Sequence, residues 1–182
     1  MMLRKFLFIA VMAAGMSAYA QQQDHTQPGT PMPAMRLGTV DTQSADFCRK
    51  HPDLVTAAHT RIYTGDDFMN KSPLLVMIFN PNCSHCEDQA ERIMKRIDMF
   101  RRSKLVMITD TTNNVYLPHF IQAFGLDKHK DVVTVGADLN GFIKEAYLYQ
   151  ALPQICIYDK DRKLVRNFAG GAAMDSLAQY IR

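Results

Sequence analysis

Two cysteines separated by two residues stand where a strand-like run gives way to a helix-like pattern. Cys83 and Cys86 lie within FNPNCSHCEDQAERI, which opens an amphipathic stretch. A thiolate at a helix N-terminus is stabilised by unpaired backbone N–H groups and by the positive end of the helix dipole. We therefore expect Cys83 to be the exposed nucleophile and Cys86, one turn along, to be the shielded resolving thiol. A disulfide between them would close and open with little backbone movement.

Two other uses of the pair are less well supported. A purely structural disulfide would contribute little, because so short a loop removes little entropy from the unfolded chain. A structural zinc site needs about four ligands, usually from two such pairs. The sequence has one Cys-x-x-Cys and no other His or Cys cluster with ligand spacing. We expect neither a metal nor an organic cofactor.

The elements around the pair follow from hydrophobic periodicity. The continuous apolar runs 74–79 and 104–109 predict strands buried on both faces. Between them, the helix opened by Cys83 places its apolar residues on one face: Ala90, Ile93, Met94, Ile97 and Phe100. Further on we expect a helix over 118–124, a short strand over 132–135, a helix over 142–149, a hairpin of strands 154–158 and 164–169, and a last helix after Gly170-Gly171. This order predicts an α/β domain with a mixed sheet covered by helices on both sides.

Residues from about 60 to 182 resemble the thioredoxin-fold superfamily, and in particular its exported bacterial thioredoxin-like, or redoxin, members. The resemblance is carried by the apolar strand, by FNPNCSHC, by the long amphipathic helix and by ALPQICIYDKDRKLV. It implies a thioredoxin-like fold with an extra strand and helix inserted between 126 and 149, ahead of the cis-proline strand. It also implies that Cys83 and Cys86 are catalytic and that Pro153 is the cis-proline beside them, where Pro153 and Leu152 line a substrate groove.

Three positions near the cysteines depart from ordinary thioredoxin. Met77 stands where thioredoxin has a buried Asp, and Asn82 stands where it has a Trp. The dipeptide between the cysteines is Ser84-His85, and a His at this position resembles protein disulfide isomerase and the periplasmic oxidases. There the His favours the thiolate form, which makes the disulfide a better oxidant. These departures keep disulfide exchange but leave its physiological direction open between reductant, oxidant and isomerase.

Glu87 directly follows the second cysteine in the first helical turn. A negative charge there is favourable with the helix dipole, which accounts for Glu87 without any chemistry. The alternative is that Glu87 accepts a proton during exchange.

A peroxidase of the peroxiredoxin type is excluded by spacing. The peroxiredoxin motif has Pro seven residues and Thr or Ser three residues before its reactive cysteine. Val76 and Asn80 occupy these positions before Cys83, and Phe79 and Cys83 occupy them before Cys86.

Two further cysteines lie away from the pair. Cys156 belongs to an apolar strand and is expected to be a buried, unreactive thiol. Cys48 lies in DFCRKHPDL. It is either a second buried thiol or a partner for Cys156, and both alternatives stay open.

The N-terminal region predicts export. Arg4 and Lys5 precede a short apolar stretch that ends at Ala18-Tyr19-Ala20, so residues 1–20 resemble a secretory signal peptide. Residues 21–45 are rich in Gln, Thr, Pro and Gly and are expected to be a flexible linker, followed by a thioredoxin-like domain over 46–182. Cleavage would leave 19 of the 21 basic residues against 18 acidic ones, a balance that disfavours nucleic acid as a partner. We expect an extracytoplasmic protein without a stable membrane anchor.

The predicted function is thiol–disulfide exchange with protein substrates and a redox partner, through Cys83 and Cys86, supported by His85, Glu87 and Pro153. The alternative is a binding module of the same fold whose cysteines have lost their activity.

Overall fold

The computed structural model describes residues 24–40 and 59–181. The strands are β1 Arg36–Val40, β2 His59–Thr64, β3 Leu74–Ile78, β4 Lys104–Asp110, β5 Val133–Asp138, β6 Gln154–Tyr158 and β7 Leu164–Ala169. The α-helices are α2 Ser84–Met94, α3 Leu117–Ala123, α4 Phe142–Ala146 and α5 Met174–Ala178. Short 3-10 helices are η3 Gly65–Phe68, η4 Ile97–Phe100, η5 Thr111–Tyr116 and η6 Leu126–His129.

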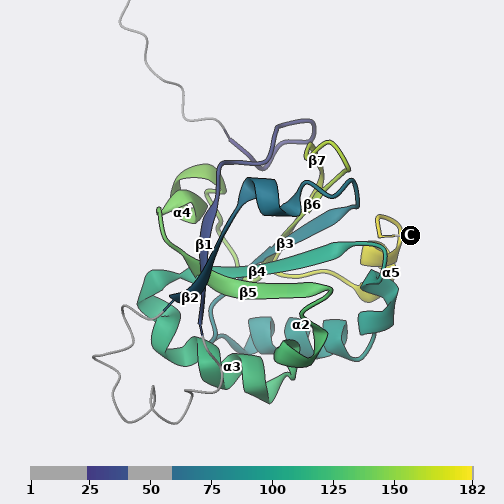
Figure 1. Cartoon of the computed structure of the whole chain (residues 1–182). Helices are drawn as coiled ribbons and strands as arrows, with labels where there is room; N and C mark the ends of the chain where they lie inside the picture. Colours follow the sequence, from purple (N-terminus) through teal and green to yellow (C-terminus); the bar gives the residue numbers. More distant parts are fainter. Residues whose placement is uncertain (1–23, 41–58, 182) are drawn as a thin grey trace, which may run out of the picture.

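In the described part of the chain the strands form one sheet, in the order β2-β1-β5-β4-β3-β6-β7 (Figure 1). The pairs β3–β4 and β4–β5 are parallel and the others are antiparallel, so the sheet is mixed. Every residue of β3 is buried, which explains why its sequence is apolar without alternation. The prediction of a mixed sheet with helices on both faces is confirmed.

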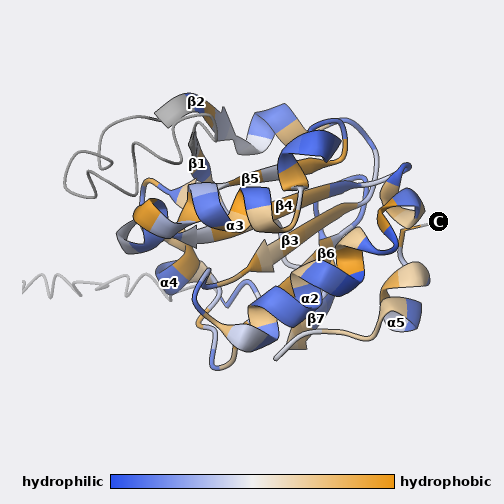
Figure 2. Cartoon of the chain, turned by 90° about the horizontal axis from the view of Figure 1, so that it is seen from below, coloured by the Kyte–Doolittle hydropathy of each residue, from blue (hydrophilic) through white to orange (hydrophobic). Residues whose placement is uncertain are grey.

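Each face of the sheet has its own core. The first core lies under α2, α3 and α5 and includes Cys86, Phe120 and Leu177. The second lies under α4 and includes Tyr147 and Cys156. Figure 1 shows α2 and α3 below the sheet and α4 above it. In Figure 2 the strands behind α2 and α3 are largely hydrophobic.

Helix α2 begins at Ser84 as the sequence predicts but ends at Met94, and the predicted apolar face continues into η4, which carries Ile97 and Phe100. The expected apolar face points to the first core, with Ala90, Ile93 and Phe100 buried and Met94 and Ile97 packed partly against it. The opposite face is charged, and the i,i+4 pair Glu91–Lys95 lies on it at 2.8 Å.

The predicted linker over 21–45 is wrong for residues 24–40. Strand β1 pairs with both β2 and β5, and the segment before it bonds to the β6–β7 hairpin. Leu164 N–H donates to Thr30 O at 2.8 Å, and Met32 N–H donates to Arg162 O at 2.8 Å. Backbone pairing and the burial of Met35 and Leu37 in the second core both order this segment, and the domain therefore begins well before residue 46. The predicted signal peptide and the segment 41–58 lie outside the described residues.

The predicted insertion is present as η6, β5 and α4. Strand β5 extends to Asp138, further than the predicted 132–135, because Gly136 permits a close approach to β1. A Cβ on Gly136 would lie 2.5 Å from the carbonyl oxygen of Gly38. Helix α4 ends at Ala146, earlier than predicted, where Leu148 adopts a left-handed backbone with φ 44°.

Candidate active site

The loop between β3 and α2 carries Cys83 to the start of the helix. Asn80 Oδ1 accepts from the N–H of Asn82 at 2.9 Å, and Asn80 O accepts from the N–H of Cys83 at 3.1 Å. Cys83 is the N-cap of α2, and its carbonyl accepts from the N–H groups of Cys86 and Glu87 at 2.9 and 3.0 Å. The Asn-Pro-Asn turn thus places Cys83 where the helix dipole is positive.

The two thiols occupy different environments. Cys83 is half-buried, whereas Cys86 is fully buried in the first core. Burial is the main reason that the pKa of Cys86 rises to about 12, and a hydrogen bond from Cys86 to Cys83 raises this pKa further. A backbone hydrogen bond from Asn80 opposes the rise. The arrangement leaves Cys83 accessible to a substrate and keeps Cys86 protonated behind it.

Pro153 lies at the same end of the sheet as the cysteine loop, where β3 ends and β6 begins. The bond Leu152–Pro153 is cis, as the sequence resemblance predicts. Gln154, the next residue, pairs with Ile78, the last residue of β3. Since the loop to Cys83 also leaves from the end of β3, the register brings the cis-proline and the cysteine loop to the same end of the strands. Contact between Pro153 and either sulfur stays a prediction.

The two polar residues predicted to support the thiols are both exposed, in the first turn of α2. His85 lies between the cysteines, and Glu87 follows Cys86. The charge of Glu87 raises the pKa of Cys86, although less than burial does. Glu87 therefore disfavours ionisation of Cys86 in the resting dithiol.

Charged groups at the carboxyl ends of the neighbouring strands β4 and β5 hold the inserted helix α4 in place. Lys144 of α4 pairs with Asp110, at the end of β4, at 2.5 Å. The hydrogen bond from Lys144 is the main reason that the pKa of Asp110 is lowered. Asp138, at the end of β5, accepts from the N–H groups of Asn140 and Ile143 at 3.1 and 2.9 Å and so caps α4.

Cys156 lies in the other core. It is fully buried, as predicted, and burial raises its pKa to about 12. Its sulfur lies 3.6 Å from Gln154 Nε2 and 3.6 Å from Asn167 Oδ1. Cys48 lies outside the described residues, so its pairing with Cys156 stays open.

No group of three or more His, Cys, Asp or Glu side chains in the described part of the chain is arranged to hold a metal ion. None of the helices described there combines the length and the apolar character that crossing a membrane requires.

Known structures share this architecture at low sequence identity. The thioredoxin domain of a thiol-disulfide oxidoreductase from Bacteroides vulgatus aligns with a TM-score of 0.62 and 15% identity, covering 86% of this chain and 99% of that one. A secreted disulfide oxidoreductase from Mycobacterium tuberculosis aligns with a TM-score of 0.53 and 16% identity, covering 66% and 87%. The peroxidoxin BcpB from the same species aligns with a TM-score of 0.58 and 15% identity, covering 85% and 93%. No protein-family model and no curated protein matches the sequence.

The chain has the thioredoxin fold. Several solved thiol–disulfide oxidoreductases share this fold, and so does a peroxidoxin, so the fold alone does not distinguish these two activities. Val76 and Asn80 occupy the positions at which the peroxiredoxin motif would need Pro and Thr or Ser.

At the position where ordinary thioredoxin has a buried Asp, this chain has the apolar residue Met77. Met77 is fully buried in the first core, opposite Met107 of β4 and Ile155 of β6. Its thioether cannot accept the proton of a thiol at neutral pH. The proton of Cys86 must therefore leave by another route.

Sequence reasoning missed one buried polar side chain of the helix that carries the cysteines. Gln89 is 1% exposed and lies on the apolar face of α2 with Cys86, Ala90 and Ile93. The signal was available, because Gln89 follows Cys86 by three residues and precedes Ile93 by four, the spacing of a single helix face.

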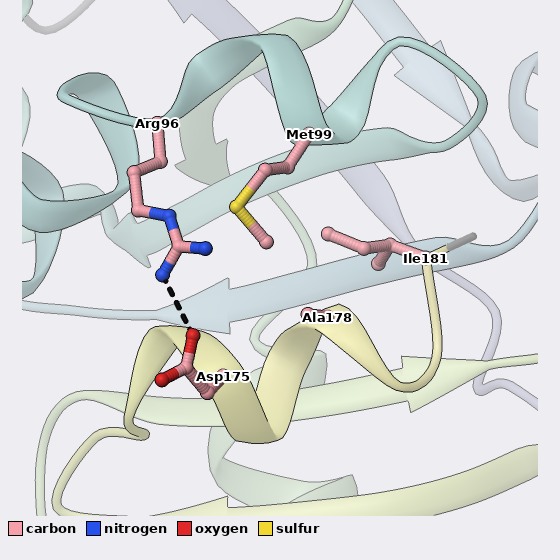
Figure 3. Close-up of a pocket in the computed structure, with 5 residues that line it drawn as sticks. All are labelled: Arg96, Met99, Asp175, Ala178 and Ile181. Carbon is pink, nitrogen blue, oxygen red and sulfur yellow. Dashed lines mark hydrogen bonds and ion pairs between the residues drawn. The ribbon is translucent and has the colours of Figure 1, made fainter.

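A surface cavity of about 350 Å³ lies beyond the C-terminal end of α2, between η4 and α5, and is separate from the thiols. It is lined by Arg96, Met99, Asp175, Ala178 and Ile181 (Figure 3). At about 1.5 Å of rise per residue, Met94, the last residue of α2, lies roughly 12 Å along the helix from Cys86, and Arg96 follows beyond it. This cavity is therefore no part of the candidate active site.

Proposed function

We propose that the chain is an extracytoplasmic thiol–disulfide oxidoreductase that acts on protein substrates. The observation that carries the proposal is the placement of a half-buried Cys83 at the N-terminus of α2 and of a fully buried Cys86 one turn along. Support for export comes from the signal-like residues 1–20 and from the secreted M. tuberculosis oxidoreductase that shares the fold.

Exchange in the reducing direction takes two steps. The Cys83 thiolate attacks one sulfur of a substrate disulfide, and a Cys83–substrate disulfide forms as the other substrate sulfur leaves as a thiolate. Cys86 then loses its proton and attacks Cys83 Sγ, which releases the second substrate thiolate and forms the Cys83–Cys86 disulfide. The proton of Cys86 passes to water or to a departing substrate thiolate. Oxidation of a substrate dithiol is the same sequence in reverse.

The substrate would bind as an extended chain beside Pro153. Pro153 is buried and Leu152 is half-buried just before β6, and the backbone of Leu152 is proposed to pair with an extended segment of the substrate. His85 is proposed to stabilise the Cys83 thiolate, which favours the dithiol form and makes the disulfide more oxidising. Physiological direction then depends on the redox partner.

Reduction of insulin by dithiothreitol tests the activity. The wild-type protein should accelerate precipitation of the insulin B chain, whereas Cys83→Ser should not, and Cys156→Ser should retain the wild-type rate. A binding module with inactive cysteines would give no acceleration in any form. Cys86→Ser should instead accumulate a stable mixed disulfide, and isolating it from the native compartment identifies the substrate.

A further inference from the structure

A buried amide ties the helix that carries the cysteines to the loop between β7 and α5. Gln89 Oε1 accepts from the backbone N–H of Ala172 at 2.9 Å. The Nε2 group of the same side chain lies 4.0 Å from Met174 Sδ. Gln89 and Ala172 are both buried. This hydrogen bond is therefore made away from water, where leaving the Ala172 donor unpaired would be costly.

The tethered loop lies directly against the cis-proline. Gly170 and Gly171 adopt left-handed backbone angles, with φ 78° and 98°. A Cβ on Gly171 would lie 2.8 Å from Gln89 Oε1 and 3.6 Å from Pro153 Cγ. Gly171 thus lies between the side-chain oxygen of Gln89 and the ring of Pro153. All three lie at the end of the sheet from which the loop to Cys83 leaves.

A second tie between neighbouring parts of the chain joins Arg96, just after the C-terminal end of α2, to Asp175 in the first turn of α5. Arg96 Nη1 contacts Asp175 Oδ1 at 2.9 Å, across the surface cavity shown in Figure 3. The side chains of Arg96 and Asp175 are 46% and 91% exposed, so this ion pair contributes little. The two ties differ in burial and in their distance from the thiols, which provides a matched control.

We propose that Gln89 is a positioning residue for the substrate chain. It holds the backbone of residues 170–172 against Pro153, so that the wall of the groove is set before an extended polypeptide binds. The inference rests on the proposed function and extends it, since it ascribes to Gln89 a role in recognising polypeptide disulfides and none in the sulfur chemistry. A small disulfide, which needs only to reach Cys83, should not depend on Gln89.

The experiment compares two substrates in four variants. Gln89→Met removes the acceptor at similar volume, and Gln89→Asn retains an amide that is one methylene too short. Gln89→Glu keeps an acceptor oxygen at the same reach, and Arg96→Met removes the exposed tie. The KM and kcat for insulin are measured alongside the rate of reaction with 5,5′-dithiobis(2-nitrobenzoic acid). Amide hydrogen exchange of Ala172 reports whether the loop is held.

Loss of one preorganising hydrogen bond should raise the KM for insulin about 5- to 10-fold in Gln89→Met and Gln89→Asn, with kcat little changed. Exchange at Ala172 should accelerate in both variants, while the rate with the small disulfide stays at the wild-type value. Gln89→Glu should restore slow exchange and the wild-type KM, although its buried carboxyl group should lower the free energy of unfolding. Arg96→Met should leave every quantity unchanged.

Two results would overturn the inference while leaving the proposed function intact. One is an unchanged KM for insulin in an active Gln89→Asn variant whose Ala172 exchanges faster. The other is an equal loss of rate with both substrates, which would place the effect of Gln89 on the thiols themselves. A wild-type protein that reacts with neither disulfide would instead refute the proposed function, and the role of Gln89 with it.

Discussion

Replacing Met77 by Asp should accelerate the second step of disulfide exchange. In the dithiol form the pKa of Cys86 is about 12, raised from 9.0 mainly by burial. At pH 7 the thiolate fraction is then about 10⁻⁵ instead of about 10⁻², a deficit of about a thousandfold. A more basic thiolate is a better nucleophile, and a Brønsted coefficient of about 0.4–0.5 returns about 15- to 30-fold of that deficit.

The net penalty on resolution is therefore about 30- to 60-fold at pH 7. This figure is an upper bound, because the hydrogen bond and charge of Cys83 are lost when it enters the mixed disulfide. Burial, the largest cause, persists in that state. Met77 shares the first core with Cys86 and offers no proton acceptor. A carboxylate at this position should recover much of the penalty, at a cost of roughly 3–5 kcal/mol in the free energy of unfolding.

The assay is rapid-quench analysis of a single turnover with a peptide disulfide, following the Cys83–peptide adduct by mass spectrometry. The wild-type adduct should accumulate near neutral pH, and its decay should accelerate about tenfold per pH unit up to about pH 10, because Cys86 is still largely protonated there. In Met77→Asp the decay should be faster at pH 7 and less dependent on pH. Met77→Asn is the matched control, since Asn has nearly the same shape as Asp but no titratable group. A wild-type adduct that never accumulates, with equal decay in both variants, would show that Met77 is only a packing residue.

Three further predictions concern the cysteines. Under limiting iodoacetamide near pH 7, the reduced protein should be labelled first at Cys83, because Cys86 and Cys156 are buried. Peptide mass mapping reads the labelled site. Early labelling at either buried thiol would contradict the assignment of Cys83 as the most accessible and reactive cysteine. Equilibration with glutathione should give a potential less reducing than thioredoxin's roughly −270 mV and nearer roughly −180 mV, and His85→Pro should lower it; a wild-type value at or below that of thioredoxin contradicts the role of His85. The thiols of Cys86 and Cys156 have raised pKa values, so the folded state retains protons that the unfolded chain loses above about pH 9, and stability should fall there by about 1.4 kcal/mol per pH unit for each thiol. Urea unfolding between pH 8 and 10 tests this last prediction, and Cys156→Ser should halve the decline; a flat profile would mean that the two thiols ionise normally.

The centre of the sheet was predictable because its chemistry is local. Strands β3 and β4 are unbroken apolar runs, which is what a strand covered on both faces requires. The positions of Cys83 and Cys86 followed from the strand-to-helix junction, and the cis bond at Pro153 followed from the resemblance. In these places the pattern of neighbouring residues determines the structure directly.

The periphery was not predictable in the same way. Strand β1, with the sequence RLGTV, depends on hydrogen bonds to β5, whose sequence lies far along the chain. Gly38 and Gly136 lower the strand propensity of both segments, yet the missing Cβ of Gly136 is what lets the two backbones approach. The hydrogen bond between Gln89 and Ala172 could not be predicted either, since it joins segments far apart in sequence. Such long-range contacts leave only a weak trace, here a single polar residue in an apolar stripe.

The pairing of residues 29–32 with the hairpin at 162–164 has a consequence for the order of folding. The earliest described segment of the chain finds its partners close to the other end, and β1 has no central neighbour until β5 has been made. A ribosome releasing this chain from its N-terminus therefore cannot complete the sheet until almost the whole polypeptide is available. Closing such long loops costs entropy before the contacts form, which slows folding. Until residues 162–164 are available, residues 29–32 lack the backbone partners that they have in the folded protein.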